Sequence, residues 1–224
     1  MKRIRKAVRV TSVIMAAILT ALVATVLCAP GEDRIALTEA LDGLHVQEES
    51  GRQIDWDSLP AEVIAWVEVP GTGIDEPVVQ ASPDSPNAYL YRDVFGQGAY
   101  GTPYIDCECS IDSRLVIVYG HHMSDGTAFA EFADFIDEEF AREHSRIIVY
   151  KRSGEALDLE VCAIDVVNAS RERLVIDQEE SFEKIVGAAD LQLSDPAEAE
   201  QLFAFTTCSY QTWNSRTIVY AHHA

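Results

Sequence analysis

Residues 202–221 read LFAFTTCSYQTWNSRTIVYA. Two apolar, β-branched segments in this stretch, 202–208 and 216–221, have the composition of buried strands. A thiol, Cys208, ends the first segment, and a guanidinium, Arg216, opens the second. The stretch therefore indicates a fold built on short buried strands, and it directs attention to the chemistry at their ends.

Similar apolar runs recur on the N-terminal side of this stretch. Strands are expected at 66–69, 77–80, 100–106, 115–119, 146–150 and 157–167. Helices are expected to begin near 58–60 and to cover 128–144, 181–186 and 195–201. Aromatic residues recur at helical spacing in 128–144, and this stripe is expected to pack in the core. Numerous short strands with intervening helices predict a mainly-β fold with α insertions, a β-barrel.

The N-terminus carries a topology signal. Residues 1–9 hold five basic residues and no acid, and Val10–Ala29 is an uncharged run of 20 residues. As a helix this run would be about 30 Å long, the thickness of a bilayer's hydrocarbon core. Positive charge stays on the cytoplasmic side of a membrane. The sequence thus predicts a cytoplasmic tail (1–9), a transmembrane signal anchor (10–29), an acidic stalk or helical region (30–57) and an extracellular domain (58–224).

A cleaved signal peptide is the alternative interpretation of this N-terminus. Its apolar region is usually only about 7–15 residues long. The residues Leu27-Cys28-Ala29 also make a poor cleavage site. An uncleaved anchor is therefore favoured.

The formal net charge of −20 excludes one class of partner. Beyond the basic tail the chain carries −25. Such a surface repels phosphate backbones, so binding of nucleic acid is not expected. The hydrophobic content of 48% argues against global disorder and allows one well-packed domain.

The cysteines give no metal or disulfide pattern. Cys107 and Cys109 lie two apart, so on a strand they would share a face, and a bond between them would be strained. No further ligand with metal-site spacing lies nearby, so a metal site at these cysteines is not expected. Cys162, inside an apolar segment, is expected in the core. No function is assigned to Cys107 or Cys109.

Three residues at strand ends have the chemistry of an acyl-transfer site. An unperturbed thiol has a pKa of about 8.5, so a nucleophilic Cys208 needs a group that favours its thiolate. A histidine such as those after Gly120 can do this and can protonate a leaving amine. The guanidinium of Arg216 can stabilise an oxyanion. A structural cysteine and a solvated arginine explain the same residues, so the pattern alone leaves both interpretations open.

A family resemblance adds to this pattern. From Ile64 to the C-terminus the chain resembles the class B sortases, the membrane-anchored cysteine transpeptidases of Gram-positive bacteria. The segments that carry the resemblance occur in the family's order: 66–75 with 77–80, 89–93 with 95–96, 101–106, 119–123 with 125–127 and Phe129, 206–208, and 216–221. The resemblance implies a closed β-barrel of about eight strands, with N-terminal helices and an N-terminal transmembrane helix.

The resemblance also implies roles for individual residues. Cys208 matches the nucleophile, His121 the acid/base, and Arg216 the group that holds the substrate carbonyl or oxyanion. His122 falls at a variable position and is interpreted as a bystander. Four further residues are expected to contribute to substrate binding: Thr206, Thr207, Ser209 and Tyr210. Only seven residues separate Cys208 from Arg216, a short connection for this family, which places inherited substrate preferences in doubt.

The reaction implied is transpeptidation at the cell surface. Cys208 would cleave a C-terminal sorting motif of secreted proteins after Thr and form a thioacyl-enzyme. An amine of a peptidoglycan precursor, or a pilin lysine, would resolve it. The enzyme would lie in the cell membrane as a single-pass protein, with its catalytic domain outside. It would need no cofactor.

Two alternatives remain at this point. One is another cysteine acyltransferase of the cell wall, such as an L,D-transpeptidase. Those enzymes usually carry a Ser-x-Gly-Cys run, whereas Cys208 follows Thr206-Thr207. The other is a non-catalytic, membrane-anchored binding domain on a sortase-like barrel.

Overall fold

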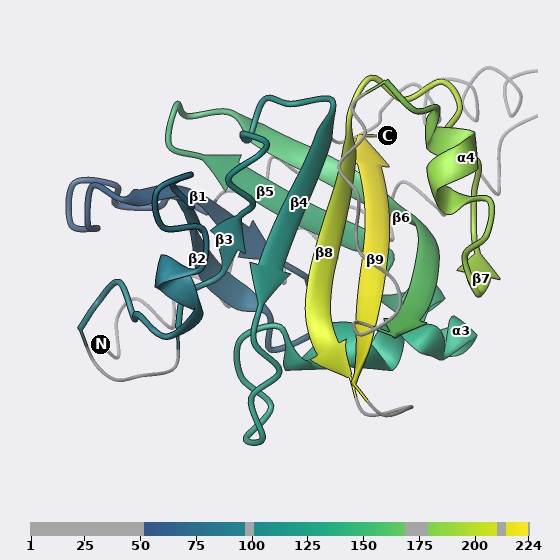
Figure 1. Ribbon diagram of the computed structural model, residues 1–224, viewed down its shortest axis with the longest axis horizontal. Helices are drawn as coiled ribbons and strands as arrows, with labels where there is room; N and C mark the ends of the chain where they lie inside the picture. The colour runs from purple at the N-terminus through teal and green to yellow at the C-terminus, as the bar shows by residue number, and fades with distance from the viewer. Residues whose placement is uncertain (1–51, 97–100, 169–178, 210–213, 224) are drawn as a thin grey trace, which may run out of the picture. The chain divides into compact units, whose positions relative to one another are not determined.

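Short strands carry the fold (Figure 1). The structure, a computed structural model, describes residues 52–96, 101–168, 179–209 and 214–223. The strands are β1 (Val63–Glu68), β2 (Asp75–Gln80), β3 (Tyr104–Ile105), β4 (Leu115–Gly120), β5 (Arg146–Lys151), β6 (Ala156–Asn168), β7 (Leu191–Gln192), β8 (Leu202–Ser209) and β9 (Ser215–His223). The helical segments are η1 (Ala88–Leu90), η2 (Ala130–Ile136), α3 (Glu138–Glu143) and α4 (Phe182–Val186).

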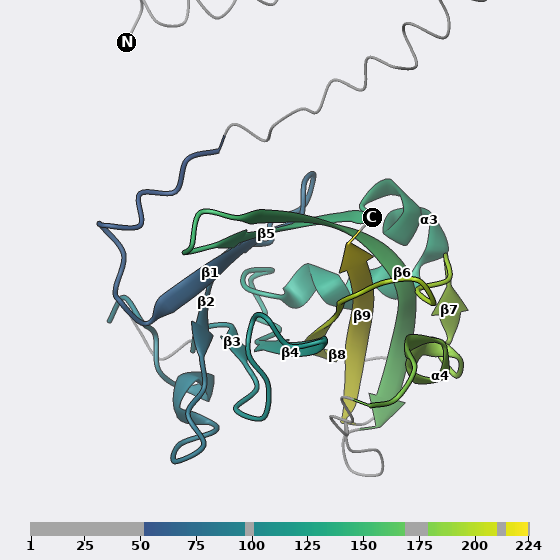
Figure 2. The same cartoon turned by 90° about the horizontal axis from the view of Figure 1, so that it is seen from above.

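Eight of the strands close into a barrel, seen from above in Figure 2. Their order is β5-β1-β2-β3-β4-β8-β9-β6, and the pairing of β5 with β6 completes the ring. β7 pairs with β6 outside the ring. The pairs β2–β3 and β4–β8 are parallel, whereas the other pairs in the ring are antiparallel. The prediction of a mainly-β closed barrel is confirmed.

Aromatic side chains fill the barrel from the end at which β4 and β8 finish. The helix η2 lies across that end, the lower one in Figure 1. Phe132 of η2 stacks on Phe205 of β8 with ring centroids 5.3 Å apart, and Phe129 meets Phe132 edge-on at 4.9 Å. All three rings are fully buried, each worth about 1.5–3 kcal/mol of transfer free energy. The expectation that the aromatic stripe packs in the core is confirmed.

The helix expected over 128–144 is two short helices. η2 is a 3-10 helix that ends at Ile136, and α3 begins at Glu138. Asp137 between them has an extended backbone, and its side chain accepts a hydrogen bond from the Phe140 N–H at 3.1 Å. An N-cap carboxylate of this kind starts a new helix, which explains the break.

Two other expected helices are turns. The main chain at Ser58 and Leu59 makes only turn hydrogen bonds, and β1 begins at Val63, too soon for a helical nucleus to propagate. Near Asp195, the carboxylate accepts from the Ala197 N–H at 3.0 Å. This local bond competes with helix formation. The short helix expected at 181–186 is present as α4.

β1 begins at Val63, three residues before the expected 66–69, whereas β3 covers only Tyr104–Ile105 of the described part of 100–106. Pro103 lacks an N–H group, and the Thr102 N–H is bonded to the Tyr89 carbonyl at 3.0 Å. The paired residues of β3 therefore begin after Pro103, whose carbonyl accepts from the Val79 N–H of β2 at 3.0 Å. β7 was not anticipated, because two residues give no periodic signal.

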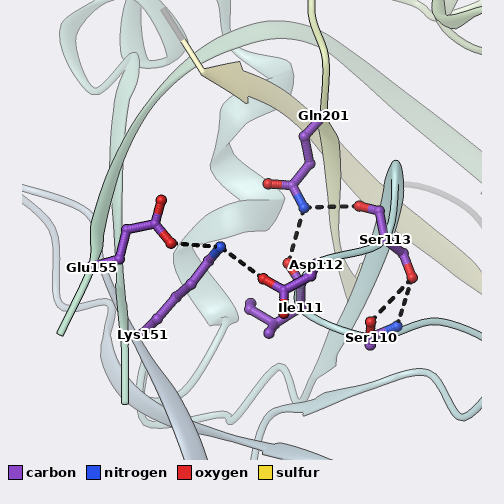
Figure 3. Close-up of polar contacts among 7 residues, drawn as sticks. All are labelled: Ser110, Ile111, Asp112, Ser113, Lys151, Glu155 and Gln201. Carbon is purple, nitrogen blue, oxygen red and sulfur yellow. Dashed lines mark hydrogen bonds and ion pairs between the residues drawn. The ribbon is translucent and has the colours of Figure 1, made fainter. Parts of the chain in front are cut away.

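Polar contacts hold the opposite end of the barrel (Figure 3). Lys151, at the end of β5 and only 9% exposed, pairs with Asp112 at 2.9 Å and with Glu155 at 3.0 Å. The Gln201 side-chain amide donates to the carbonyls of Ile111, at 2.9 Å, and Ser113, at 2.8 Å. These contacts connect the loop before β4 to β5, to the turn after β5 and to Gln201, the residue before β8.

The predicted tail (1–9), anchor (10–29) and most of the stalk (30–57) lie outside the described residues. Within the described ranges, no helix is both long and apolar enough to cross a membrane. The same ranges contain no cluster of three or more metal-ligating side chains.

Candidate active site

The ends of three strands bring the candidate catalytic residues together. β4 and β8 run parallel, and their pairing ends at Gly120 and Thr207, so His121, the first residue after β4, comes beside Cys208, which is still in β8. β9 returns antiparallel to β8 with Arg216 paired directly to Cys208. All three side chains line one pocket of about 370 Å³. In Figure 1 these strand ends are at the lower end of β4 and β8.

Cys208 has the properties of the available nucleophile. It is the exposed one among the four described cysteines, all of which are free thiols. Desolvation raises the pKa of Cys109 to about 11 and that of Cys162 to about 12. Desolvation and the nearby Asp106 carboxylate also raise the pKa of Cys107. These three thiols are therefore disfavoured as thiolates, and Cys162 is in the core as expected.

His121 is held by the backbone of the neighbouring η1 segment. Its Nε2 is hydrogen-bonded to the carbonyl oxygen of Leu90. A carbonyl can only accept, so Nε2 carries the proton and Nδ1 is the nitrogen left to exchange protons with a substrate. The Tyr91 ring lies alongside, with its centroid 6.4 Å from that of the imidazole.

Two glycines make room for this arrangement. A Cβ on Gly101, whose φ is +73°, would lie 2.8 Å from His121 Cδ2 and 2.6 Å from the Leu90 oxygen. A Cβ on Gly120 would lie 2.3 Å from the Phe129 ring. Side chains at these positions would displace the imidazole or the core ring beneath it.

Comparison with known proteins identifies the family of this chain. The model of the sortase domain matches residues 67–224. The chain belongs to the sortase family. Sortase B of Listeria monocytogenes is 27% identical over 94 residues, which are 40% of this chain and only 37% of the relative's length.

Solved class B sortases share the sortase fold seen here. Sortase B of Clostridium perfringens has a TM-score of 0.63 at 24% identity, covering 73% of this chain and 94% of that one. Sortase B of B. anthracis has a TM-score of 0.61 at 26% identity, covering 72% and 77%. A Streptococcus pyogenes class B sortase involved in pilus biogenesis has a TM-score of 0.65 at 20% identity, covering 76% and 98%.

In this sortase a polar wall faces the three residues. The rings of Tyr104 and Tyr119 lie 5.4 Å apart, and both line the pocket with Asp106. Desolvation raises the pKa of both tyrosines; the Asp106 carboxylate raises it further, while the positive charge of Arg216 lowers it. The charges of Asp106 and Arg216 thus act on both phenols, which stay protonated and can donate hydrogen bonds.

The remaining residues predicted to bind substrate divide into three groups. Thr206 and Thr207 line the pocket, and their buried hydroxyls have no hydrogen-bond partner within the described part of the chain. Ser209 is buried away from the pocket, where its hydroxyl donates to the Ser215 hydroxyl at 3.1 Å. Tyr210 lies outside the described residues.

Several parts of the site were not predicted from the sequence. Leu90 contributes a backbone carbonyl, which has no sequence signature. Tyr104, Asp106 and Tyr119 lie in segments that carry the family resemblance but received no role. His122 was interpreted as a bystander, yet its Nδ1 is 2.9 Å from the carbonyl oxygen of Cys208.

Proposed function

We propose that this sortase is a cysteine transpeptidase in which Cys208 is the nucleophile, His121 the acid/base and Arg216 the oxyanion partner. The proposal rests on one observation: an exposed thiol, an oriented imidazole and a guanidinium line the same pocket. Those are the groups needed to split an amide through a thioester.

The acylation step follows from the position of each group. The Cys208 thiolate adds to the carbonyl carbon of the scissile bond, and the Arg216 guanidinium donates to the resulting oxyanion. The C–N bond then breaks, and the His121 imidazolium gives its Nδ1 proton to the departing amine. A thioacyl-enzyme and a free amine are the products, with Nε2 of His121 still bonded to Leu90.

Deacylation runs the same steps in reverse with another amine. The acceptor amine attacks the thioester carbonyl and gives a proton to Nδ1 of His121, and the Cys208 thiolate leaves. Water in place of the amine would give hydrolysis. The half-buried imidazole is thus used twice, as acid and then as base.

The substrates proposed are secreted proteins with a C-terminal sorting motif, cleaved after Thr, of the Asn-Pro-Gln-Thr-Asn or the Leu-Pro-x-Thr-Gly kind. The acceptor proposed is an amine of a peptidoglycan precursor or a pilin lysine. The basic residues 1–9 and the apolar run 10–29 support a single-pass location in the cell membrane, with the catalytic domain outside. Anchoring would hold the enzyme at the membrane face from which both substrates emerge.

A peptide-cleavage assay tests this proposal. Peptides with each motif, carrying a fluorophore and a quencher, are incubated with wild type, Cys208→Ala and Cys107→Ala, with and without a glycine-peptide amine. We expect cleavage by wild type and by Cys107→Ala, no cleavage by Cys208→Ala, and a ligated product only with the amine. Full activity in Cys208→Ala would refute the assignment. An inert thiol at Cys208 would favour a non-catalytic binding domain.

A further inference from the structure

We infer that His122 is a positioning residue for the nucleophile. Its imidazole holds the main-chain carbonyl of Cys208 at a point of β8 that the main chain of β4 no longer pairs with. The observation behind this is the 2.9 Å contact between Nδ1 of His122 and the carbonyl oxygen of Cys208. The inference rests on the proposed role of Cys208. It concerns a residue that acts through the nucleophile and does not touch substrate.

The register of β4 and β8 gives the contact its meaning. The Leu202 N–H donates to the Arg114 carbonyl at 2.9 Å, so Leu202 turns its backbone polar groups toward β4. Backbone groups alternate sides along a strand, so those of Cys208, six residues later, also face β4. The paired register ends one step earlier, at Gly120 and Thr207. The Cys208 carbonyl therefore lies just beyond the end of the β4–β8 ladder, where no strand residue of β4 is left to donate to it.

The main chain of β4 has turned away at this point. His122 forms an isolated bridge with Ala128, and the Phe129 N–H donates to the His121 carbonyl at 2.9 Å. These contacts fold residues 121–129 into a tight loop, visible below β4 in Figure 1. The side chain of His122, instead of its main chain, reaches back to β8 and extends the ladder by one bond.

The two adjacent histidines are held by different ring nitrogens. His121 uses Nε2 on the Leu90 carbonyl, and His122 uses Nδ1 on the Cys208 carbonyl. Because a carbonyl only accepts, His122 must carry a proton on Nδ1. The dipeptide thus links the η1 wall of the pocket to the nucleophile strand, and it fixes the spacing between the imidazole of His121 and the thiol of Cys208.

The distance between the imidazole of His121 and the thiol of Cys208 controls the rate of the chemical step. A misplacement of about 1 Å between reacting groups can cost about 100-fold in rate, whereas binding of the rest of the substrate is little affected. Loss of the His122 contact should therefore lower kcat and leave KM nearly unchanged. A role limited to stability would lower the melting temperature and leave kcat of the folded enzyme intact.

Three substitutions at one position test the inference with the cleavage assay. The amide nitrogen of Asn can occupy the place of Nδ1, whereas the longer Gln places its amide nearer Nε2. We expect His122→Ala and His122→Gln to lower kcat about tenfold or more, with KM within about twofold. We expect His122→Asn to recover kcat to within about threefold of wild type.

His144→Ala is the matched control. His144 Nδ1 also bonds a backbone carbonyl, that of Pro70 at 3.3 Å, but at a place that does not line the pocket. This variant should keep wild-type kcat even if its melting temperature falls. Wild-type kcat in His122→Ala, or equal kcat in the Asn and Gln variants, would overturn the inference. If His122→Ala does not fold, the Asn and Gln variants decide.

Cys208→Ala, assayed in parallel, separates this inference from the proposed function. An active Cys208→Ala variant overturns both. An inactive Cys208→Ala variant together with a fully active His122→Ala variant overturns only the role of His122.

Discussion

Cys208 and Arg216 are direct partners across the β8–β9 pair, and Ser209 and Ser215 form the next pair toward the turn. The serine hydroxyls bond to each other at 3.1 Å, and Ser215 also donates to the Ser209 carbonyl at 2.9 Å. A connection of only seven residues between thiol and guanidinium therefore suffices, because the two side chains need only face each other across one strand pair.

Arg216 should be sensitive even to a conservative change. Arg216→Ala should lower kcat/KM about 100- to 1,000-fold, as for loss of an oxyanion donor. Arg216→Lys should recover little of this, because an ammonium lacks the planar fork of donors. Arg142→Lys, on the surface with Glu138 as its partner, is the control and should behave as wild type. Steady-state peptide cleavage measures all three, and a fully active Arg216→Lys would contradict the role assigned.

Gly101→Ala should impair catalysis through His121. The backbone has φ of +73°, which costs a non-glycine residue about 1–2 kcal/mol, and the new methyl would press on the imidazole at 2.8 Å. We expect a lower melting temperature and about tenfold lower kcat.

Gly96→Ala separates these two effects. Its φ is +68°, but nothing lies within 4 Å of its Cβ position. It should lose only the stability that the positive φ costs, less than Gly101→Ala loses, and keep its activity. Equal kcat losses in both variants would show that backbone strain alone, without contact to His121, explains the effect.

Lys151 should contribute a stability that disappears in alkali. Desolvation lowers its pKa, but hydrogen bonds from Lys151 to Asp112 and Glu155 outweigh this, so the pKa lies above its ordinary value of 10.5. A raised folded-state pKa stabilises the fold below the unfolded pKa, and the stabilisation is lost as pH rises through the folded pKa. We expect Lys151→Gln to cost about 1 kcal/mol near pH 8 and progressively less above pH 10.5. Urea unfolding of both proteins from pH 8 to pH 11.5 measures the difference. A gap that stays constant with pH would contradict the role of the ion pair.

The sequence predicted the barrel where strands are long and apolar. β4, β6, β8 and β9 were located because each carries a continuous run of core residues. β3 and β7 were misjudged or missed because two-residue strands depend on neighbours far away in the chain. The helix over 128–144 was drawn too long because the aromatic spacing continues through the Asp137 cap.

The candidate site was predictable only where a side chain has its own chemistry. Cys208, His121 and Arg216 were selected by residue type and by family order, and the strand register brings them together. Leu90 contributes a backbone carbonyl, which every residue type carries, so its role could not be predicted from the sequence. His122 was set aside because its contact depends on where the β4–β8 ladder ends, which is a property of the folded chain.

The proposed role of Cys208 requires that its thiol form a thioester with the sorting peptide. The most direct measurement is intact mass spectrometry of the enzyme mixed with excess peptide in the absence of an acceptor amine, followed by proteolytic mapping of any adduct. We expect a mass increase equal to the peptide up to its Thr, located on Cys208, removed by added amine and absent in Cys208→Ala. An adduct on another residue, or cleavage of the peptide with no adduct and undiminished rate in Cys208→Ala, would contradict that role.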